Sequence, residues 1–475
     1  MTYDVVVPTV GRPSLARTLA GLAAGDGPLP ERVIVVDDRR DAAEPLNVDV
    51  APLWRERTIV IRGGGRGPAA ARNAGARAGT AEWIAFLDDD VVPPAGWRLA
   101  LERDIRAADD AAATQGRVMA AGADPHQIVK GLETAVWITA DMAFRRDAFE
   151  AIGGFDERFR RAYREDSDLG LRLTAAGERI VTGDRHVSHP VPPSSPWAAV
   201  GRQRGNADDA LMLFLHGPGW SVRAHAPRGD RRQHILTTAL FAGSMLALAI
   251  GRPRSGGAMF GAWLARTRRL AQRRGDVASS VAIPFAATWW WSYGLVRAWK
   301  LTRRPRAVLF DRDGTLVEDV PYNGDPRLVR PRPGARAALS RLRRAGIQVG
   351  MVTNQSGVGR GLVSHEQVLA VNARVEELLG PLDVTVVCTH APDEGCACRK
   401  PQPGLVLEAA RRLGVRPAEC AVVGDIESDM QAALNAGARG VLVPNAVTRP
   451  DEVVRAKEVA TTLEQAVSLL IGPGR

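Results

Sequence analysis

The sequence predicts an α/β protein with two separate open sheets and a basic helical segment between them. First, short apolar runs alternate with helical periodicity in the N-terminal part and again in the C-terminal third. Second, carboxylates or glycines follow several predicted strands directly, as they do where ligands bind beyond strand ends. Third, residues 223–306 hold 16 arginines or lysines but only two acids, Asp230 and Asp276, although the whole chain has a net charge of +10. We therefore expect domains at 1–225, 226–304 and 305–475.

Four apolar runs in the N-terminal part are predicted strands, because they are rich in β-branched residues and end in polar turns. Helical spacing of leucine or alanine follows the first and third runs. Together they indicate a Rossmann-like sheet with its polar loops along one edge. The predicted strands are Tyr3–Pro8, Arg32–Val36, Thr58–Ile61 and Trp83–Leu87, and the predicted helices are Ser14–Ala24 and Ala69–Ala78.

The loops after the second and third strands carry groups that suit a nucleotide diphosphate. Asp37 or Asp38 can accept hydrogen bonds from a base or ribose. The glycines of residues 63–67 let backbone N–H groups and Arg72 approach a diphosphate at a helix N-terminus. A flexible loop is the plainer alternative for the glycine run.

The fourth predicted strand ends in three aspartates. Asp88 and Asp90 can hold a divalent cation that bridges the diphosphate, although a solvated turn has the same composition. Together with the preceding loops, these aspartates form an ordered series that resembles the family-2 glycosyltransferases of GT-A fold. The series spans about residues 1–225 and consists of Pro8-Thr9, Asp37-Asp38, Arg72–Gly75, Asp88–Asp90, Gly153–Glu157 and Glu165-Asp166.

This resemblance implies an inverting transferase that uses a nucleotide-sugar donor. The residues it assigns are Asp37, Asp38, Arg72, Asp88 and Asp90 for the nucleotide-sugar and its Mg²⁺ or Mn²⁺, and Asp166, supported by Glu165, for the general base. His189 stands where such enzymes often carry a histidine near the diphosphate, and an ordinary structural histidine is the alternative. The donor base, the sugar and the acceptor stay open.

The middle segment combines apolar runs, tryptophans and arginines. The runs Ile235–Ile250 and Val277–Trp299 flank a predicted arginine-rich loop. Helices that lie on an anionic membrane suit this pattern, with tryptophan at headgroup depth and arginine on lipid phosphates. Buried helices packed on the transferase are the main alternative. A single span at Val277–Trp299 is disfavoured because it would separate the two catalytic domains, and no motif indicates nucleic-acid binding.

The C-terminal part repeats the strand and helix alternation of an open α/β sheet. No insert between the strands is large enough for a big cap domain, so we expect an open site and a small substrate. The predicted strands are Ala307–Phe310, Gln348–Val352, Val384–Val387, Ala421–Val423 and Val441–Val443, and the helices are Ala335–Ala345, Ser364–Leu379 and Gly404–Leu413.

Two carboxylates follow the first of these strands. Asp311 and Asp313 lie one residue apart, and such a pair is costly unless a cation such as Mg²⁺ sits between them. Asp311 can attack a phosphoryl group, and Asp313 can protonate the leaving oxygen. Thr353 can bind a phosphate oxygen, and Lys400 can neutralise the phosphate. A turn rich in aspartate and glycine is the alternative for the pair alone.

These residues occur in an order that resembles the haloacid dehalogenase (HAD)-type phosphatases. The order is Asp311-x-Asp313-Gly-Thr, then Thr353, then Lys400, then Gly424-Asp425 with Asp429 four residues later, within residues 305 to about 470. The resemblance implies a reaction through an aspartyl-phosphate. It also implies an Mg²⁺ site of Asp311, Asp313 and Asp425, with Asp429 beside it.

Three thiols and one imidazole lie close together in the sequence. Cys388, His390, Cys396 and Cys398 suit a tetrahedral structural Zn²⁺, with free buried cysteines as the alternative. This loop, together with residues 354–357 and 360–361, resembles the branch of D-glycero-D-manno-heptose 1,7-bisphosphate phosphatases and histidinol-phosphatases. The substrate contacts expected there are Asn354, Arg360, Arg399 and Lys400.

The sequence thus predicts a bifunctional enzyme, a sugar phosphatase joined to a glycosyltransferase. The expected phosphatase substrate is the 7-phosphate of D-glycero-D-manno-heptose 1,7-bisphosphate. The alternative is a phosphatase for histidinol phosphate or another small phosphomonoester, with the transferase fold as a sugar-binding or membrane-targeting module. Residues 1–5 do not resemble a secretory signal, so we expect a cytoplasmic protein, peripheral at the inner face of the plasma membrane.

Overall fold

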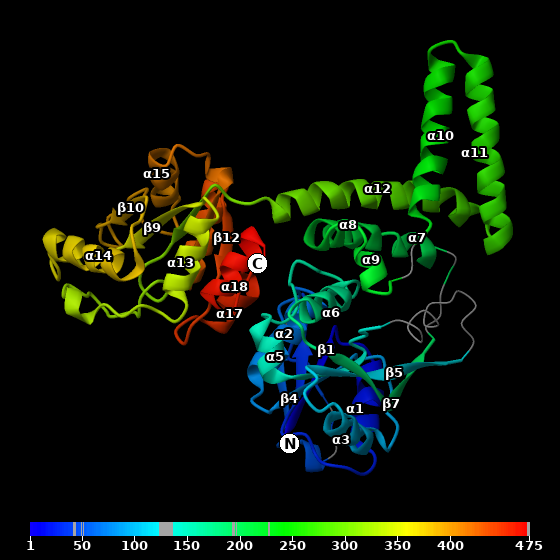
Figure 1. The fold of residues 1–475 in the computed structure, drawn as a ribbon, viewed down its shortest axis with the longest axis horizontal. Coiled ribbons are helices and arrows are strands. Elements are labelled where there is room, and N and C mark those ends of the chain that lie inside the picture. Colours follow the sequence, from blue (N-terminus) through cyan, green and yellow to red (C-terminus); the bar gives the residue numbers. More distant parts are fainter. Residues whose placement is uncertain are drawn as a thin grey trace. The chain divides into compact units, whose positions relative to one another are not determined.

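The computed structural model describes residues 1–40, 44–48, 50, 52–122, 136–191, 195, 197–226 and 229–472. They form two compact units, Met1–Leu301 and Thr302–Arg475 (Figure 1). Each unit contains one open sheet with helices packed against it. The predicted α/β fold class is therefore confirmed. The middle segment up to Leu301 falls in the first unit.

The N-terminal unit contains a seven-stranded sheet in the order β3-β2-β1-β4-β6-β5-β7. Strands β1 to β4 are mutually parallel, and β6 runs antiparallel to both β4 and β5. The three later strands lie outside the predicted set. The bounds are β1 Tyr3–Thr9, β2 Val33–Asp37, β3 Thr58–Arg62, β4 Trp83–Leu87, β5 Ala113–Ala121, β6 Asp141–Arg145 and β7 Ile180–Pro190.

The parallel register of this sheet brings the polar strand ends to one edge. Thr9 lies opposite Asp37, and Asp37 lies opposite Arg62. Every residue of β1, β2 and β4 is buried, as expected for strands covered on both faces. The helices of this part are α1 Ser14–Ala23, α2 Pro68–Ala78, α3 Trp97–Ala107, α5 Arg146–Ala151, α6 Glu165–Ala175, α7 Ala198–Arg202, α8 Gly205–His216 and α9 Trp220–Arg223.

Three long helices complete the first unit: α10 Arg231–Ala249, α11 Pro253–Arg274 and α12 Val277–Thr302. The prediction of an arginine-rich loop between the two apolar runs was wrong, because residues 253–274 form helix α11. Pro253 suits the first helical turn, and Gly275 ends the helix in the left-handed conformation (φ +71°). Among the described residues, no helix is both long and apolar enough to cross a membrane.

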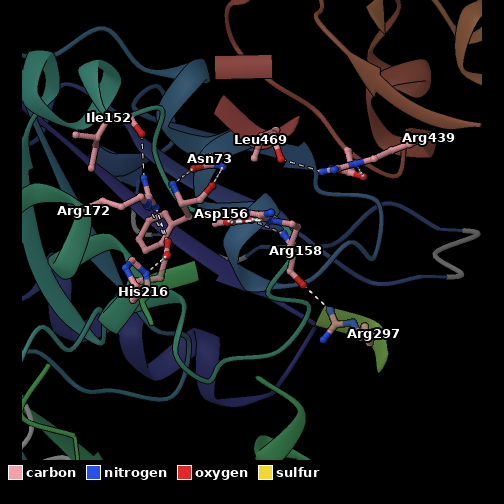
Figure 2. Close-up of polar contacts among 12 residues, drawn as sticks. Asn73, Ile152, Asp156, Arg158, Arg172, His216, Arg297, Arg439 and Leu469 are labelled. Atoms are coloured by element: carbon pink, nitrogen blue, oxygen red, sulfur yellow. Dashed lines mark hydrogen bonds and ion pairs between the residues drawn. The ribbon is translucent and has the colours of Figure 1, made fainter. Parts of the chain in front are cut away.

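Helix α12 packs against α8 of the N-terminal unit, which agrees in part with the alternative that these helices pack on the N-terminal domain. A Cβ at Gly294 would come within 2.5 Å of the Ala207 backbone, so only glycine permits this approach to α8. The Arg297 guanidinium contacts Asp208 at 3.2 Å and donates to the carbonyl of Arg158 (Figure 2). These contacts fix the helix to the unit.

The C-terminal unit contains a five-stranded, fully parallel sheet in the order β10-β9-β8-β11-β12. Residues 311–347, between β8 and β9, hold only the short helix η2 (Pro326–Leu328) and α13, so this stretch carries no large cap. The strands are β8 Ala307–Phe310, β9 Gln348–Asn354, β10 Val384–Cys388, β11 Cys420–Gly424 and β12 Arg439–Leu442. The helices are α13 Ala335–Arg344, α14 His365–Leu379, α15 Gly404–Arg412, α16 Glu427–Ala436, α17 Pro450–Arg455 and α18 Leu463–Ile471.

Candidate active sites

The carboxyl edge of the C-terminal sheet forms a cavity of about 460 Å³. Asp311 follows β8, Thr353 is the next-to-last residue of β9, and Asp425 follows β11; these three strands are neighbours in the sheet. Lys400 enters the same cavity from the loop that precedes α15. The fold therefore brings the four predicted phosphatase residues to one place.

Lys400 is buried and bridges two carboxylates. Its Nζ pairs with Asp311 and lies 2.6 Å from Oδ1 of Asp429. It also donates to the carbonyl oxygen of Val352 at 3.1 Å. Burial opposes the charge on Lys400, but the attraction of Asp311 and Asp429 outweighs it and raises the pKa of the ammonium. A charged ammonium beside Asp311 can orient the carboxylate and bind a phosphate oxygen.

Three carboxylates come together beside Lys400. Oxygen atoms of Asp311, Asp425 and Asp429 lie within 4.8 Å of one another. Burial, followed by the charge of Asp429, raises the pKa of Asp425 to about 6. Clustered buried carboxylate oxygens suit a hard cation such as Mg²⁺, which would relieve their repulsion. Asp429, expected beside the metal site, is thus a member of this carboxylate group.

Asp313 lies in the same cavity but its carboxylate is engaged elsewhere. Arg312 Nη2 lies 3.0 Å from its Oδ2, and Gln355 Nε2 donates to the same oxygen at 2.8 Å. Arg312 is itself buried, and its Nη1 donates to Oδ1 of Asn372 at 2.9 Å. Asp313, the expected acid/base carboxylate, is therefore bound by Arg312 and Gln355 and is not one of the three grouped carboxylates.

Asp425 is held by residues that the sequence did not single out as ligand-binding. Thr315 Oγ1 donates to Asp425 Oδ1 at 3.1 Å, and Asn445 Nδ2 donates to Oδ2 at 2.7 Å. Gly314 has φ +75°, and a Cβ there would lie 2.3 Å from the same Oδ2. Asn445 follows β12 at the carboxyl edge of the sheet, and that position was the available signal for it.

Of the other predicted substrate residues, Asn354 lines this cavity, whereas Arg360 and Arg399 are not among its lining residues. Asn354 fixes the Lys400 backbone, because its side chain accepts from Lys400 N at 3.1 Å and donates to Lys400 O at 3.2 Å. Arg360 donates to the hydroxyl of Tyr322 at 2.8 Å, and Tyr322 lines the cavity. The Arg399 N–H donates to Cys396 Sγ at 3.4 Å, which joins this loop to the cysteine cluster.

The four predicted zinc ligands meet in a tight cluster. Cys398 Sγ lies 3.3 Å from Cys388 Sγ, 3.3 Å from His390 Nδ1 and 3.5 Å from Cys396 Sγ. Zinc–sulfur bonds of about 2.3 Å in a tetrahedron separate sulfur atoms by about 3.8 Å. The donor set and its spacing therefore fit a Zn²⁺ ion. The fourth cysteine, Cys420, lies apart at the start of β11.

The N-terminal sheet has its own cavity of about 360 Å³ at the carboxyl edge. Most of the predicted transferase residues line it, including Asp38, Arg72, Asp88, Asp90, Glu165, Asp166 and His189. Asp37 is absent from the lining. Its carboxylate is buried and paired with Arg39 at 2.8 Å, which holds the pKa of Asp37 below its usual value. Asp38 accepts from the backbone N–H groups of Arg66 and Gly67 at 2.9 Å and so orders the glycine loop.

Arg72 is fully buried between two carboxylates. Its Nη2 contacts Asp88 at 2.6 Å, and its Nη1 contacts Glu165 at 2.9 Å. Burial, followed by the charge of Asp166, raises the pKa of Glu165 to about 8, and burial also raises the pKa of Asp166. Arg72 thus links the loop of Asp88 to helix α6.

The aspartate triplet is divided among different partners. Asp89 accepts from Thr9 Oγ1 and from Arg12 Nη1 at 2.8 Å, a pairing that the sequence did not indicate. Asp90 lies 2.9 Å from the same Arg12 nitrogen and 3.5 Å from His189 Nε2. In the described residues, only the Cys/His cluster and the Asp311 group gather three candidate ligand atoms. A cation at Asp88 and Asp90 would therefore need further ligands, such as the oxygens of a diphosphate.

The Gly153–Glu157 segment is held by Asn73 of α2. The Asn73 amide donates to the carbonyl of Phe155 at 2.8 Å and accepts from the Phe155 N–H at 2.9 Å (Figure 2). Neighbouring side chains of α2 thus hold two different parts of the unit: Arg72 contacts the cavity residues Asp88 and Glu165, and Asn73 fixes the segment around Phe155.

Two family models match the chain, one in each unit. A glycosyl transferase family 2 model matches residues 4–167, and a haloacid dehalogenase-like hydrolase model matches residues 325–437. The D-glycero-beta-D-manno-heptose-1,7-bisphosphate 7-phosphatase of Bordetella bronchiseptica is 38% identical over 143 residues, which is 29% of this chain and 80% of that protein. The C-terminal unit belongs to the HAD-like hydrolases.

Other similar proteins match the same HAD-like unit. The protein of the same name from Mesorhizobium japonicum is 36% identical over 184 residues, 36% of this chain and 84% of that protein. A crystal structure of D,D-heptose 1,7-bisphosphate phosphatase from B. bronchiseptica, complexed with magnesium and phosphate, has 32% sequence identity and a TM-score of 0.32, covering 35% of this chain and 98% of that chain. The predicted pairing of a family-2 glycosyltransferase domain with a HAD-like phosphoric monoester hydrolase is confirmed.

Proposed function

We propose that the C-terminal unit is an Mg²⁺-dependent phosphatase that removes the 7-phosphate from D-glycero-D-manno-heptose 1,7-bisphosphate. The observation that carries this proposal is the buried Lys400 ammonium between Asp311 and Asp429, beside Asp425. The relatives named above supply the substrate class, since both are named as 7-phosphatases of this sugar. The open cavity of about 460 Å³ suits a small sugar phosphate.

In the proposed reaction, an Asp311 oxygen attacks phosphorus and forms an aspartyl-phosphate as the bond to the sugar oxygen breaks. Asp313, held by Arg312 and Gln355, gives its proton to the departing oxygen. Asp313 then accepts a proton from the water that attacks the phosphoenzyme, and phosphate leaves. Lys400 and Thr353 hold the phosphoryl oxygens in position. Mg²⁺ at Asp311 and Asp425 would balance the negative charge of phosphate and carboxylates.

We propose a Zn²⁺ ion at the four-ligand cluster, with a structural role. The Arg399 N–H contacts Cys396, and Lys400 follows directly, so an ordered metal loop would position the phosphate-binding side chains. The substrate-facing residues of this region are Asn354, Arg360, Arg399 and Lys400. Their role in binding the sugar phosphate is part of the same proposal.

A phosphate-release assay tests the substrate. Heptose 1,7-bisphosphate should be hydrolysed with a much higher kcat/KM than histidinol phosphate. The reverse order would support the second candidate, a histidinol-phosphate or other small phosphomonoester phosphatase. The Arg360–Tyr322 contact at the cavity favours the bisphosphate, because an extra guanidinium can bind a second phosphate.

We further propose that the N-terminal unit transfers a sugar from a nucleotide-sugar with inversion. Asp166 would act as general base on the acceptor hydroxyl, with Glu165 in support, and both line the cavity. Asp88 and Asp90 would hold Mg²⁺ or Mn²⁺, and His189, whose Nε2 lies 3.5 Å from Asp90, would lie near the diphosphate. The residues assigned to the base and diphosphate are Asp37, Asp38 and Arg72.

Donor hydrolysis tests whether this unit is catalytic. Metal-dependent release of nucleoside diphosphate that is lost in Asp88→Asn would support the transferase. Donor binding without turnover, under any metal and acceptor condition tried, would favour the alternative of a sugar-binding or membrane-targeting module. We also propose that the protein is cytoplasmic and contacts the anionic inner face of the plasma membrane through its basic helices.

A further inference from the structure

Helices α10 and α11 form a hairpin with an unusual distribution of charge. Residues 231–274 contain nine arginines and no aspartate or glutamate. Between Ile235 and Ala265 the only charged residues are Arg252 and Arg254, at the turn. The hairpin thus has uncharged arms, a basic turn and further arginines near its base.

The base of this hairpin is packed on α12. Phe241 meets Phe285 of α12 at 5.3 Å and Trp263 of α11 at 5.1 Å between ring centroids. Thr288 of α12 donates to the Thr238 hydroxyl at 3.1 Å. Beyond Phe241 the two helices continue side by side toward the turn, away from α12 (Figure 1). These contacts with α12 hold the base of the hairpin. The described contacts with α12 do not extend to the outer half, which consists of the residues between Phe241 and Trp263.

The outer half has apolar side chains that the unit does not bury. Leu246 is 63% exposed, Ile250 is 57% exposed and Leu248 is 45% exposed. Both turn arginines are also exposed. Exposed leucine and isoleucine next to arginine, with no acid in either helix, are typical of a surface that meets anionic lipid.

We propose that the tip of this hairpin, residues 245–254, is the element that enters the membrane surface. Leu246 and Ile250 would lie among the acyl chains near the headgroups, about 5–10 Å deep, while Arg252 and Arg254 bind lipid phosphates. The proposal rests on the peripheral membrane contact proposed above and names the surface that makes it. A second copy of the chain is the less suitable occupant, because two strongly cationic hairpins repel each other.

Flotation with vesicles tests the tip directly. The full chain is mixed with vesicles of phosphatidylglycerol and phosphatidylcholine in equal parts, and with phosphatidylcholine alone. Wild type should float only with the anionic vesicles. Leu246→Glu/Ile250→Glu should abolish flotation, and Arg252→Gln/Arg254→Gln should weaken vesicle affinity about thirtyfold, the equivalent of about 2 kcal/mol.

Matched controls separate the tip from general surface effects. Leu369→Glu alters a leucine of α14 that is 52% exposed, and Arg336→Gln/Arg344→Gln removes two exposed arginines of α13. Both controls should float like wild type. Wild type that fails to float with anionic vesicles would overturn the membrane contact itself. If Leu246→Glu/Ile250→Glu floats as well as wild type, only the assignment of the membrane contact to the tip is overturned. The same conclusion follows if wild type forms a stable dimer in lipid-free solution and this double variant dissociates that dimer.

Discussion

Gln355 Nε2 donates to Asp313 Oδ2 and also to Thr353 Oγ1, each at 2.8 Å. One amide therefore joins the proposed acid/base carboxylate to the proposed phosphate-binding hydroxyl. Arg312 Nη2 lies 3.0 Å from the same Asp313 oxygen, and Arg312 Nε donates to the second oxygen, Oδ1, at 3.1 Å. Because a general acid must reach the leaving oxygen in the right geometry, these contacts should matter most where protonation of the leaving group limits the rate.

Replacement of Gln355 should therefore change how strongly kcat depends on the leaving group of the substrate. Gln355→Leu should lower kcat for a sugar phosphate about tenfold to a hundredfold, because an alkoxide needs a proton as it leaves. The same variant should lose much less with p-nitrophenyl phosphate, whose leaving group is stable as an anion. Steady-state phosphate release with both substrates measures the difference. An equal loss on the two substrates would argue against a role in positioning Asp313.

Gly314 should be irreplaceable next to the proposed Mg²⁺ site. Its positive φ of +75° disfavours any side chain, and a Cβ would lie 2.3 Å from Asp425 Oδ2. We expect Gly314→Ala to lower phosphate release about a hundredfold at fixed Mg²⁺ and to raise the Mg²⁺ concentration needed for half-maximal rate. Gly346→Ala is the matched control, because Gly346 has φ +70° but open space around it. Similar Mg²⁺ dependence in both variants would contradict the account.

The cysteine cluster should hold one zinc ion per chain. Cys396→Ser should reduce bound zinc, measured by elemental analysis of the purified protein, and should lower the unfolding temperature of the C-terminal unit. Cys420→Ala should retain the metal, since Cys420 lies apart from the cluster. Equal zinc content in the two variants would show that the cluster is not the metal site.

Glu165 should make the stability of the N-terminal unit fall as pH rises. Its pKa is raised from 4.5 to about 8. Between these values the unfolded chain has lost the proton that the folded protein keeps, so the free energy of unfolding decreases with pH. Glu165→Gln should reduce this slope, as measured by calorimetry between about pH 5 and pH 8 without added metal, and the raised pKa of Asp166 should leave part of it. The exposed Glu56→Gln control should keep the wild-type slope.

Much of the fold was predictable because the buried parallel strands have a clear sequence pattern. Trp83–Leu87 and Ala307–Phe310 are apolar throughout and carry charged residues directly after them. Strands β5 and β7 were missed, since they are half-exposed and mix polar with apolar residues. Helix α11 was taken for a loop because its arginines outweighed the helical preference of its alanines and leucines.

The phosphatase residues could be predicted where they follow strands, as Asp311 and Asp425 do. Their supporting partners could not, because the contact of Gln355 with Asp313 depends on how distant loops fold together. The partners of Arg72 in the N-terminal unit could not be predicted from the sequence either. Sequence suggested a diphosphate contact, whereas the folded chain pairs it with Asp88 and Glu165.

The most direct test of the two-enzyme account follows both reactions in Asp311→Asn. Wild type incubated with D-glycero-D-manno-heptose 1,7-bisphosphate should release one phosphate, with loss of the C7 signal in the phosphorus NMR spectrum. Asp311→Asn should release none, yet should turn over the nucleotide-sugar donor at the wild-type rate. Retained phosphate release in this variant, or loss of both activities in a folded protein, would contradict the account.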